Sequence, residues 1–423
     1  MSRKIILKIN KMKKQLFFIA IASLFSALAS AADLYVRDAG AGGAYSTIAA
    51  AIAAATDGDR IIIRPKTGGL PYIGDFTINK SLSFVSEINF SKYAVQGLIT
   101  FDPAAGRNIS IHNISITGNI KYNTTIPFIT GGRCNLNILN SLINGQIIAS
   151  TSGTSLNLSG CTVTQEVDCL HGKLCGNDFS LNNYVYIQYE DTNPAIVQAT
   201  SPIYIIANKI SYLGVNTTKY QFYIKNNYFS VGNSSYYPSS INISDVLVNS
   251  TNYITNNYIS NNFDSNFPNA LVNISVSSTA GAVLISNNYF SLFSANAQAI
   301  RKNIVNPNFA VNVDYNMKYS QLALTFATVG ITVGNNNFNG SVNGTVVSYI
   351  ATSGAAIDSG DPDEEYSDLN LTRNDIACGG GSDAWSNYWS STATQSQVLF
   401  LDVPSRIYQG TTTLQVEGMG YSK

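Results

Sequence analysis

Hydrophobic and polar residues alternate in short stretches along most of the chain, and one such pattern returns at regular intervals. It is an alternating stretch closed by Asn-Asn and an aromatic residue, as in FYIKNNYFS, NYITNNYIS, VLISNNYFS and, more loosely, ITVGNNNFNG. The second asparagine falls at Asn227, Asn257 and Asn288, and then at Asn336. The first two intervals, 30 and 31 residues, suit one unit of a solenoid, whereas the last, 48, requires an insertion or two short coils.

These stretches predict strands that stack in parallel. Weaker versions occur earlier in ISIHNISITG, LNILNSLING and YIIANKISYLG, and no helical pattern separates them. Without crossover helices or evenly spaced hairpin turns, neither an α/β fold nor a sandwich fits. We therefore predict an all-β parallel β-helix, with asparagine at turns of left-handed backbone geometry and asparagine side chains bonded from coil to coil. The alternative is that Asn-Asn only reflects an asparagine-rich composition.

One helical pattern stands near the start, in AYSTIAAAIAAATDGDRIIIRP. Ile48, Ile52 and Ala55 would share one face, Ser46 or Thr47 can cap the first turn, and the Asp-Gly pair ends the helix. A β-helix has an open end whose strand edge and core would face water. We expect this helix to cover that end, with RIIIRP starting the first coil.

Two segments carry a resemblance to known proteins. GGAYSTIAAAIAAATDGDRIIIRPKTGGLPYIGDFTINKSLSFVSE is similar to the N-terminal segment of secreted right-handed parallel β-helix proteins of the pectate-lyase superfold. AAIDSGDPDEEYSDLNLTRNDIACGGG resembles the closing motif of secreted β-helix proteins common in Bacteroidota. The resemblance implies a single-stranded, right-handed solenoid. It implies no single activity, because the superfold includes lyases, hydrolases, adhesins and structural proteins.

The N-terminal residues predict export. A basic segment ending at Lys14 precedes the apolar run QLFFIAIASLFSALA and a small-residue exit, so residues 1–31 resemble a signal peptide. We expect a secreted or cell-surface protein, with the periplasm as a further possibility. Residues 32–380 would form the β-helix, and residues 381–423, which alternate like short strands, a C-terminal cap on the last coil or a small β-module.

The balance of charged residues limits the classes of molecule that the protein is expected to bind. Six basic residues and no acid fall within the predicted signal, which leaves 19 basic and 25 acidic residues. This acidic balance argues against nucleic acid and anionic membranes as partners. Only 12% of the residues are charged, so the outer surface must consist largely of Asn, Ser, Thr and Tyr. No later stretch predicts a transmembrane segment.

The segment CTVTQEVDCLHGKLCGND holds the candidate catalytic residues. In a strand, Glu166 and Asp168 would share the outer face, about 6.6 Å apart, near the carboxylate separations of glycosidases. His171 and Lys173 follow in the next loop, so these four residues could form a hydrolase or lyase site. The alternative, which we favour, is a solvated turn that carries charges, because a working site also needs a groove and residues from neighbouring coils.

The cysteines suggest disulfides in an exported protein. Cys169 and Cys175 bracket the His171 loop, and Cys134 and Cys161 are 27 residues apart, close to one coil. The fifth cysteine would then be unpaired.

The segment DSGDPDEEYSDLNLTRND is a dense carboxylate cluster. Its carboxylates are ligands of the kind that Ca²⁺ prefers, although their spacing does not match an EF-hand. A bound calcium would fix the C-terminal cap; the alternative is that the side chains bond to their own backbone. The candidate ligands are Asp358, Asp361, Asp363, Asp368 and Asp375.

The expected function follows from the surface. We expect a non-catalytic exported β-helix whose polar, tyrosine-bearing surface binds a polysaccharide or another cell-surface component, because exposed tyrosines can stack on sugar rings. The alternative is a polysaccharide lyase or glycoside hydrolase that acts on acidic polysaccharide through Glu166, Asp168, His171 and Lys173.

Overall fold

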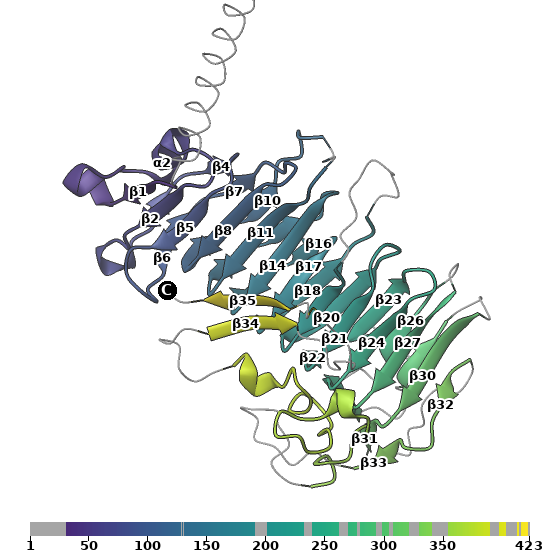
Figure 1. Ribbon diagram of the computed structural model, residues 1–423. Helices are drawn as coiled ribbons and strands as arrows, with labels where there is room; N and C mark the ends of the chain where they lie inside the picture. Colours follow the sequence, from purple (N-terminus) through teal and green to yellow (C-terminus); the bar gives the residue numbers. More distant parts are fainter. Residues whose placement is uncertain are drawn as a thin grey trace, which may run out of the picture.

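The chain forms the predicted parallel β-helix (Figure 1). The predicted signal peptide lies outside the described residues except for Ala31. The computed structural model describes residues 31–127, 129, 131–190, 201–231, 239–261, 270–276, 280–292, 298–303, 308–320, 330–340, 354–389, 397–402, 413 and 416–421.

One side of the solenoid is a parallel sheet of thirteen described strands, one from each coil. Its residues alternate between the core and the outer face, as the period-two pattern predicts. One strand was not foreseen: β1 lies outside β2, which the sequence predicts as the first coil. In spatial order the strands are β1 (Asp33–Val36), β2 (Arg60–Ile63), β5 (Ser83–Ser86), β8 (Asn108–His112), β11 (Cys134–Leu139), β14 (Thr154–Ser159), β17 (Gly172–Cys175), β19 (Ile203–Ile206), β21 (Phe222–Lys225), β24 (Thr251–Thr255), β27 (Gly281–Ser286), β30 (Phe309–Asp314) and β32 (Thr332–Val333).

The rest of each coil contributes short strands to a second sheet, with twenty described strands that pair in parallel. The long strand β18 pairs with both β15 and β16. It also pairs with β20, and the register of that pairing shifts between Phe179 and Tyr184. The strands are β3 (Tyr72–Ile73), β4 (Phe76–Ile78), β6 (Tyr93–Gln96), β7 (Ile99–Phe101), β9 (Ile114–Thr117), β10 (Ile120–Tyr122), β12 (Leu142–Asn144), β13 (Ile147–Ala149), β15 (Thr162–Val163), β16 (Val167–Cys169), β18 (Asp178–Ile187), β20 (Lys209–Asn216), β22 (Tyr228–Val231), β23 (Ile241–Asp245), β25 (Tyr258–Asn261), β26 (Ala270–Ile274), β28 (Tyr289–Leu292), β29 (Gln298–Lys302), β31 (Met317–Ser320) and β33 (Phe338–Asn339).

A ladder of asparagines, all buried except the half-buried Asn337 at its end, runs through the turns between the two sheets. Each Nδ2 group donates a hydrogen bond to Oδ1 of the asparagine in the next coil, at 2.9 to 3.1 Å. The three regular positions of the sequence pattern are confirmed, but the prediction for Asn336 was wrong, because it donates to Asp314 while its neighbour continues the ladder. The ladder consists of Asn177, Asn208, Asn227, Asn257, Asn288, Asn316 and Asn337.

The asparagine before the ladder position takes the left-handed conformation that the turn requires. The φ angles of Asn226, Asn256 and Asn287 are 56°, 57° and 59°. Asparagine tolerates this region better than most residues do. The two residues of the repeated Asn-Asn pair therefore have different roles. The first turns the chain, and the second forms hydrogen bonds between adjacent coils.

The N-terminal helix α2 (Ile48–Ala54) covers the start of the core as predicted. Thr47, rather than Ser46, is its N-cap, since its side chain accepts a hydrogen bond from Ala50 N at 3.1 Å. At the other end, Lys80 Nζ donates to the Ile52 and Ala55 carbonyls at 2.8 and 2.6 Å. The short 3₁₀ segments η1 (Asp38–Gly43) and η2 (Thr67–Gly69) lie nearby in the sequence.

The C-terminal strap, residues 354–389 and 397–402, packs along the side of the solenoid, from β31 and β33 in the last described coils to the middle coils (Figure 1). It contains η3 (Glu364–Tyr366), η4 (Trp385–Asn387) and β34 (Gln397–Asp402), which pairs antiparallel with β35 (Glu417–Tyr421). Trp389 Nε1 donates to the Ala207 carbonyl at 2.7 Å, and Phe400 packs against Tyr204.

Candidate functional site

Glu166 and Asp168 lie on the outer face of the twenty-stranded sheet, as predicted, because Val167 between them points into the core. Neighbouring coils contribute a polar partner to each carboxylate. Gln146 Nε2 donates to Glu166 Oε2 at 3.1 Å, and Gln188 Nε2 donates to Asp168 Oδ2 at 2.8 Å. We call Glu166 and Asp168 the carboxylate pair.

The charge of Glu166 acts on the neighbouring Asp168 carboxyl group. Burial, followed by the neighbouring Glu166 carboxylate, raises the pKa of Asp168 to about 6. Asp168 is only 7% exposed, and its Oδ1 atom has no hydrogen-bond partner among the described residues. A proton held between the carboxyl groups would satisfy this oxygen and reduce the charge of the pair from two to one.

Tyrosines continue the outer face beside the carboxylate pair. Asp168 is in register with Tyr186, whose ring centroid lies 4.9 Å from that of Tyr184 and 5.5 Å from that of Tyr212. In the next coil, Gly214 makes room for the Tyr186 ring, since a Cβ atom there would lie 2.5 Å from Tyr186 Cδ1. Tyr184 and Tyr186 remain partly exposed and offer aromatic faces to a ligand.

A pocket of about 610 Å³ lies at the ends of β10, β13, β16 and β18, next to the carboxylate pair. We call it the strand-end pocket. None of the described side chains that line it is charged. Its polar and aromatic lining includes Tyr122, Ser150, Thr151, Ser152, Gln188 and Tyr189.

Sequence reasoning missed the residues that neighbouring coils bring to the carboxylate pair. Lys121 lies on the same outward row, in register with Ile148, which is in turn in register with Asp168. The separations along the chain are 27 residues from Lys121 to Ile148, 20 to Asp168 and 18 to Tyr186. Because coil length varies, a fixed interval of about 30 residues could not identify these neighbours.

His171 does not join the carboxylate pair, so its predicted role beside these acids was wrong. It is 4% exposed, and its Nδ1 atom lies 2.6 Å from Ser155 Oγ. Its Nε2 atom lies 3.0 Å from the Ser201 carbonyl, which can only accept, so Nε2 carries the proton and Nδ1 accepts from Ser155. Burial, and next the Arg133 charge, lowers the pKa of His171 to about 4, which leaves the imidazole neutral at pH 7.

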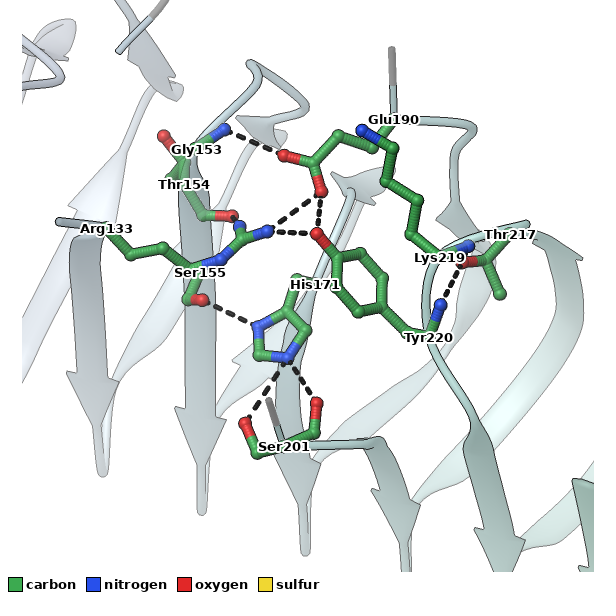
Figure 2. Close-up of polar contacts among 10 residues, drawn as sticks. All are labelled: Arg133, Gly153, Thr154, Ser155, His171, Glu190, Ser201, Thr217, Lys219 and Tyr220. Atoms are coloured by element: carbon green, nitrogen blue, oxygen red, sulfur yellow. Dashed lines mark hydrogen bonds and ion pairs between the residues drawn. The ribbon is translucent and has the colours of Figure 1, made fainter. Parts of the chain in front are cut away.

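A buried ion pair lies beside His171 (Figure 2). Arg133 Nη2 lies 2.9 Å from Glu190 Oε2, and the Tyr220 hydroxyl bonds to both side chains. The same side chains bind the backbone of an adjacent coil: Glu190 Oε1 accepts from Gly153 N at 2.8 Å, and Arg133 Nη1 donates to the Thr154 carbonyl at 2.9 Å. These contacts connect several coils and leave the Ser155 hydroxyl, 4% exposed, without access for a substrate.

Lys173 is also separated from the carboxylate pair. It lies on the outer face of the thirteen-stranded sheet, in register with Tyr204, and is 8% exposed. Its Nζ atom lies 4.2 Å from the centroid of the Phe400 ring, a cation–π contact beneath the C-terminal strap. Its predicted role as a catalytic partner of the acids was therefore wrong.

The predicted disulfides are not formed: all five cysteines lie within the described residues and have buried, free thiols. Cys169 belongs to the solenoid core, whereas Cys175 points outward into a cluster with Trp385 of the strap. Cys169 lies on β16 and Cys175 on β17, which belong to different sheets, so the Cys169–Cys175 pairing was wrong.

The Cys134–Cys161 pairing was wrong because the coil between them is short. Cys134 is in register with Thr154, only 20 residues later, so Cys161 falls on the following turn. There its backbone N–H donates to Asn177 Oδ1 at 2.9 Å, and Cys161 stands at the start of the asparagine ladder.

Three of the five predicted calcium ligands lie together. One carboxylate oxygen from each of Asp358, Asp368 and Asp375 lies within 4.8 Å of the others. Main-chain groups donate to two of these carboxylates: Asp358 N to Asp375 Oδ1 at 2.8 Å, and Gly381 N to Asp368 Oδ1 at 2.5 Å. Burial raises the pKa of Asp368 and Asp375.

The other two predicted ligands, Asp361 and Asp363, are not part of this group. The side chain of Asp363 caps η3 by accepting from Glu365 N at 3.3 Å. Burial raises the pKa of Asp361, and its own side chain accepts a hydrogen bond from Asp363 N at 3.1 Å. The cluster therefore makes the backbone bonds that the alternative interpretation expects, and calcium binding stays a prediction.

Comparisons with known proteins return no match: the chain matches no protein-family model, no curated protein and no solved structure. Within the described residues, no helix has both the length and the apolar character needed to cross a membrane.

Proposed function

We propose that this protein is an exported, non-catalytic β-helix that binds glycans at the strand-end pocket and the tyrosines beside it. The observation that carries the proposal is the pocket itself. Its volume, about 610 Å³, suits a small ligand. The described residues of its lining combine aromatic rings with hydroxyl and amide groups and carry no charge. Sugars present hydroxyl groups and apolar ring faces, which match these two kinds of side chain.

The predicted export and the acidic balance of the chain are consistent with a polysaccharide or cell-surface partner. We also propose that the protein is a member of the pectate-lyase superfold and that it has an adhesive role. The solenoid supports this use because neighbouring coils hold their outer residues at a spacing of about 4.8 Å, so several side chains can contact one extended ligand.

A glycan array probed with the chain from residue 32 onward tests the proposal. We expect binding to a defined set of glycans and a roughly tenfold weaker affinity for Tyr189→Ala, because Tyr189 is 44% exposed and lines the pocket. Tyr45→Ala, which removes an exposed tyrosine from the N-terminal region, is the matched control. Absence of glycan binding, or equal losses in both variants, would contradict the proposal.

The carboxylate pair favours a second candidate function, the cleavage of a polysaccharide by a glycoside hydrolase or a polysaccharide lyase. Two carboxyl groups on one face, one with its pKa raised to about 6, resemble the acid and base of such enzymes. His171 and Lys173 do not support this candidate, since they lie elsewhere. Release of reducing ends or unsaturated uronides by the wild type, and its loss in Glu166→Gln, would establish catalysis.

A further inference from the structure

We infer that the strand-end pocket selects uncharged sugar units over uronates, and that the carboxylate pair makes this selection. The inference rests on the glycan binding proposed above. It assigns a ligand class to the pocket and a role to Glu166 and Asp168 that requires no catalysis.

One side chain joins the carboxylate pair to the pocket. Gln188 lines the pocket, and its Nε2 atom donates to Asp168 Oδ2 at 2.8 Å. Leu170, which also lines the pocket, follows Asp168 by two residues, about 6.6 Å along an extended chain. A ligand in the pocket would therefore lie within about 8 Å of the Asp168 carboxylate.

Among the described residues, no arginine or lysine lines the pocket, and Lys121 directly precedes the lining residue Tyr122. The buried guanidinium of Arg133 is already paired with Glu190, as Figure 2 shows, and Lys209 lies 3.4 Å from Asp178.

The surroundings of the carboxylate pair add little opposing charge. From β18, Tyr184 and Tyr186 lie on the same face as the pair, and neither is a basic residue. The preceding coil contributes the uncharged Gln146. Lys121 lies two coils away from Asp168 on the same row, about 9.6 Å between backbone positions.

The expected selectivity is modest and follows from Coulomb's law. A uronate about 8 Å from one additional negative charge binds about 2 to 30 times more weakly, depending on the effective dielectric constant. An uncharged sugar does not experience this repulsion. Protonation of the pair in mildly acidic solution removes one charge while a uronate, a stronger acid, stays ionised, so discrimination should decrease between pH 7.5 and pH 5.

Matched oligosaccharides test the inference. The probes are β-1,4-glucan, β-1,4-mannan and β-1,4-galactan oligosaccharides, each paired with its C6-oxidised uronate form, and affinities are measured calorimetrically at pH 7.5 and pH 5. We expect the wild-type protein to prefer the neutral form at pH 7.5 and to discriminate less at pH 5. Asp168→Asn, which leaves only the Glu166 carboxylate of the pair, should show at both pH values the weaker preference that the wild type shows at pH 5, and so should lose the pH dependence. Asp363→Asn, which removes a carboxylate from the strap, should retain the wild-type preference and its pH dependence.

The outcomes separate the inference from the proposed function. Equal or tighter binding of the uronate forms at pH 7.5, or an unchanged preference in Asp168→Asn, would overturn the inference while glycan binding stands. If the array shows binding to acidic glycans alone, the inference is likewise overturned. If the wild-type protein binds no glycan on the array or in the panel, the inference and the proposed function fall together.

Discussion

Single buried amides set the spacing of the coils. The Asn257 side chain accepts hydrogen bonds from both the backbone and side-chain nitrogens of Asn227 at 3.0 Å, and it donates to Asn288 Oδ1 at 2.9 Å. It also donates to the Ile224 carbonyl at 2.9 Å. A buried polar group without a hydrogen-bond partner destabilises the fold, so each buried asparagine amide requires the asparagine of the neighbouring coil as its partner.

Asn257→Ala should lower the free energy of unfolding by about 3 kcal/mol or more, because it leaves several buried donors and an acceptor unpaired. Chemical denaturation measures the change. Asn144→Ala, at an exposed position of β12, is the control and should stay within about 0.5 kcal/mol of wild type. Similar effects of the two substitutions would show that the ladder contributes no special stability.

The carboxylate pair should give stability an unusual dependence on pH. The pKa of Asp168 is raised from 3.8 to about 6, so the folded protein holds this proton more tightly than the unfolded chain does. Its contribution is fully present below about pH 4 and is lost as pH rises through 6. Asp168→Asn should therefore gain stability relative to wild type at pH 8 and differ little at pH 4. His171, with a pKa lowered to about 4, titrates with the opposite sign in both proteins, so only their difference is informative. An equal difference at both pH values would contradict the assignment.

The helix α2 shows how a short element can be predicted from sequence and still need the structure for its details. Periodicity identified the buried face, since Ile48, Ile52 and Ala55 all lie in the core. The sequence left two candidates for the cap, Ser46 and Thr47, because both residue types can accept the first-turn hydrogen bond. The choice depends on how the preceding segment reaches the first coil.

Thr47→Ala should destabilise the protein by about 1 kcal/mol, because it removes the acceptor for Ala50 N. Ser46→Ala should have almost no effect. Thermal unfolding of the two variants side by side provides the measurement. A larger loss from Ser46→Ala would show that the cap is assigned to the wrong residue.

The C-terminal strap could not be placed from its sequence. Its strand-like alternation was visible, but its docking depends on aromatic residues distant in the chain: Trp389 bonds to Ala207, and Phe400 packs on Tyr204 and Lys173. No local pattern encodes these pairs. The Cys134–Cys161 pairing failed because coil length is set by turns and insertions that leave no fixed period.

Phe400→Ala should loosen the strap locally. Phe400 is 2% exposed, and its removal uncovers Tyr204 and Lys173, at a cost of about 3 kcal/mol if the site cannot repack. Limited proteolysis should then cleave the strap faster, while amide exchange at Asn227 and Asn257 stays as slow as in wild type. Faster exchange at these asparagines would mean that the strap and the solenoid unfold together.

For the molecule as a whole, alternation and repeated turns are sufficient to predict the solenoid, whereas the candidate site is not predictable to the same degree. Glu166 and Asp168 share a face because they lie two residues apart at the start of β16, a spacing that a period of two identifies. His171 and Lys173 were misplaced because the chain turns between β16 and β17, which belong to different sheets. Gln188 and Tyr186 come from another coil, and their register depends on the lengths of the coils between them.

Amide hydrogen exchange with and without a bound glycan tests the glycan-binding account most directly. The tightest glycan from the array is added to the wild-type chain, and exchange is followed by peptide. We predict slower exchange around residues 122–127, 150–152 and 184–189, with the outer face of the thirteen-stranded sheet unchanged. Protection confined to the C-terminal strap or to the thirteen-stranded sheet, or no protection at saturating glycan, would contradict the account.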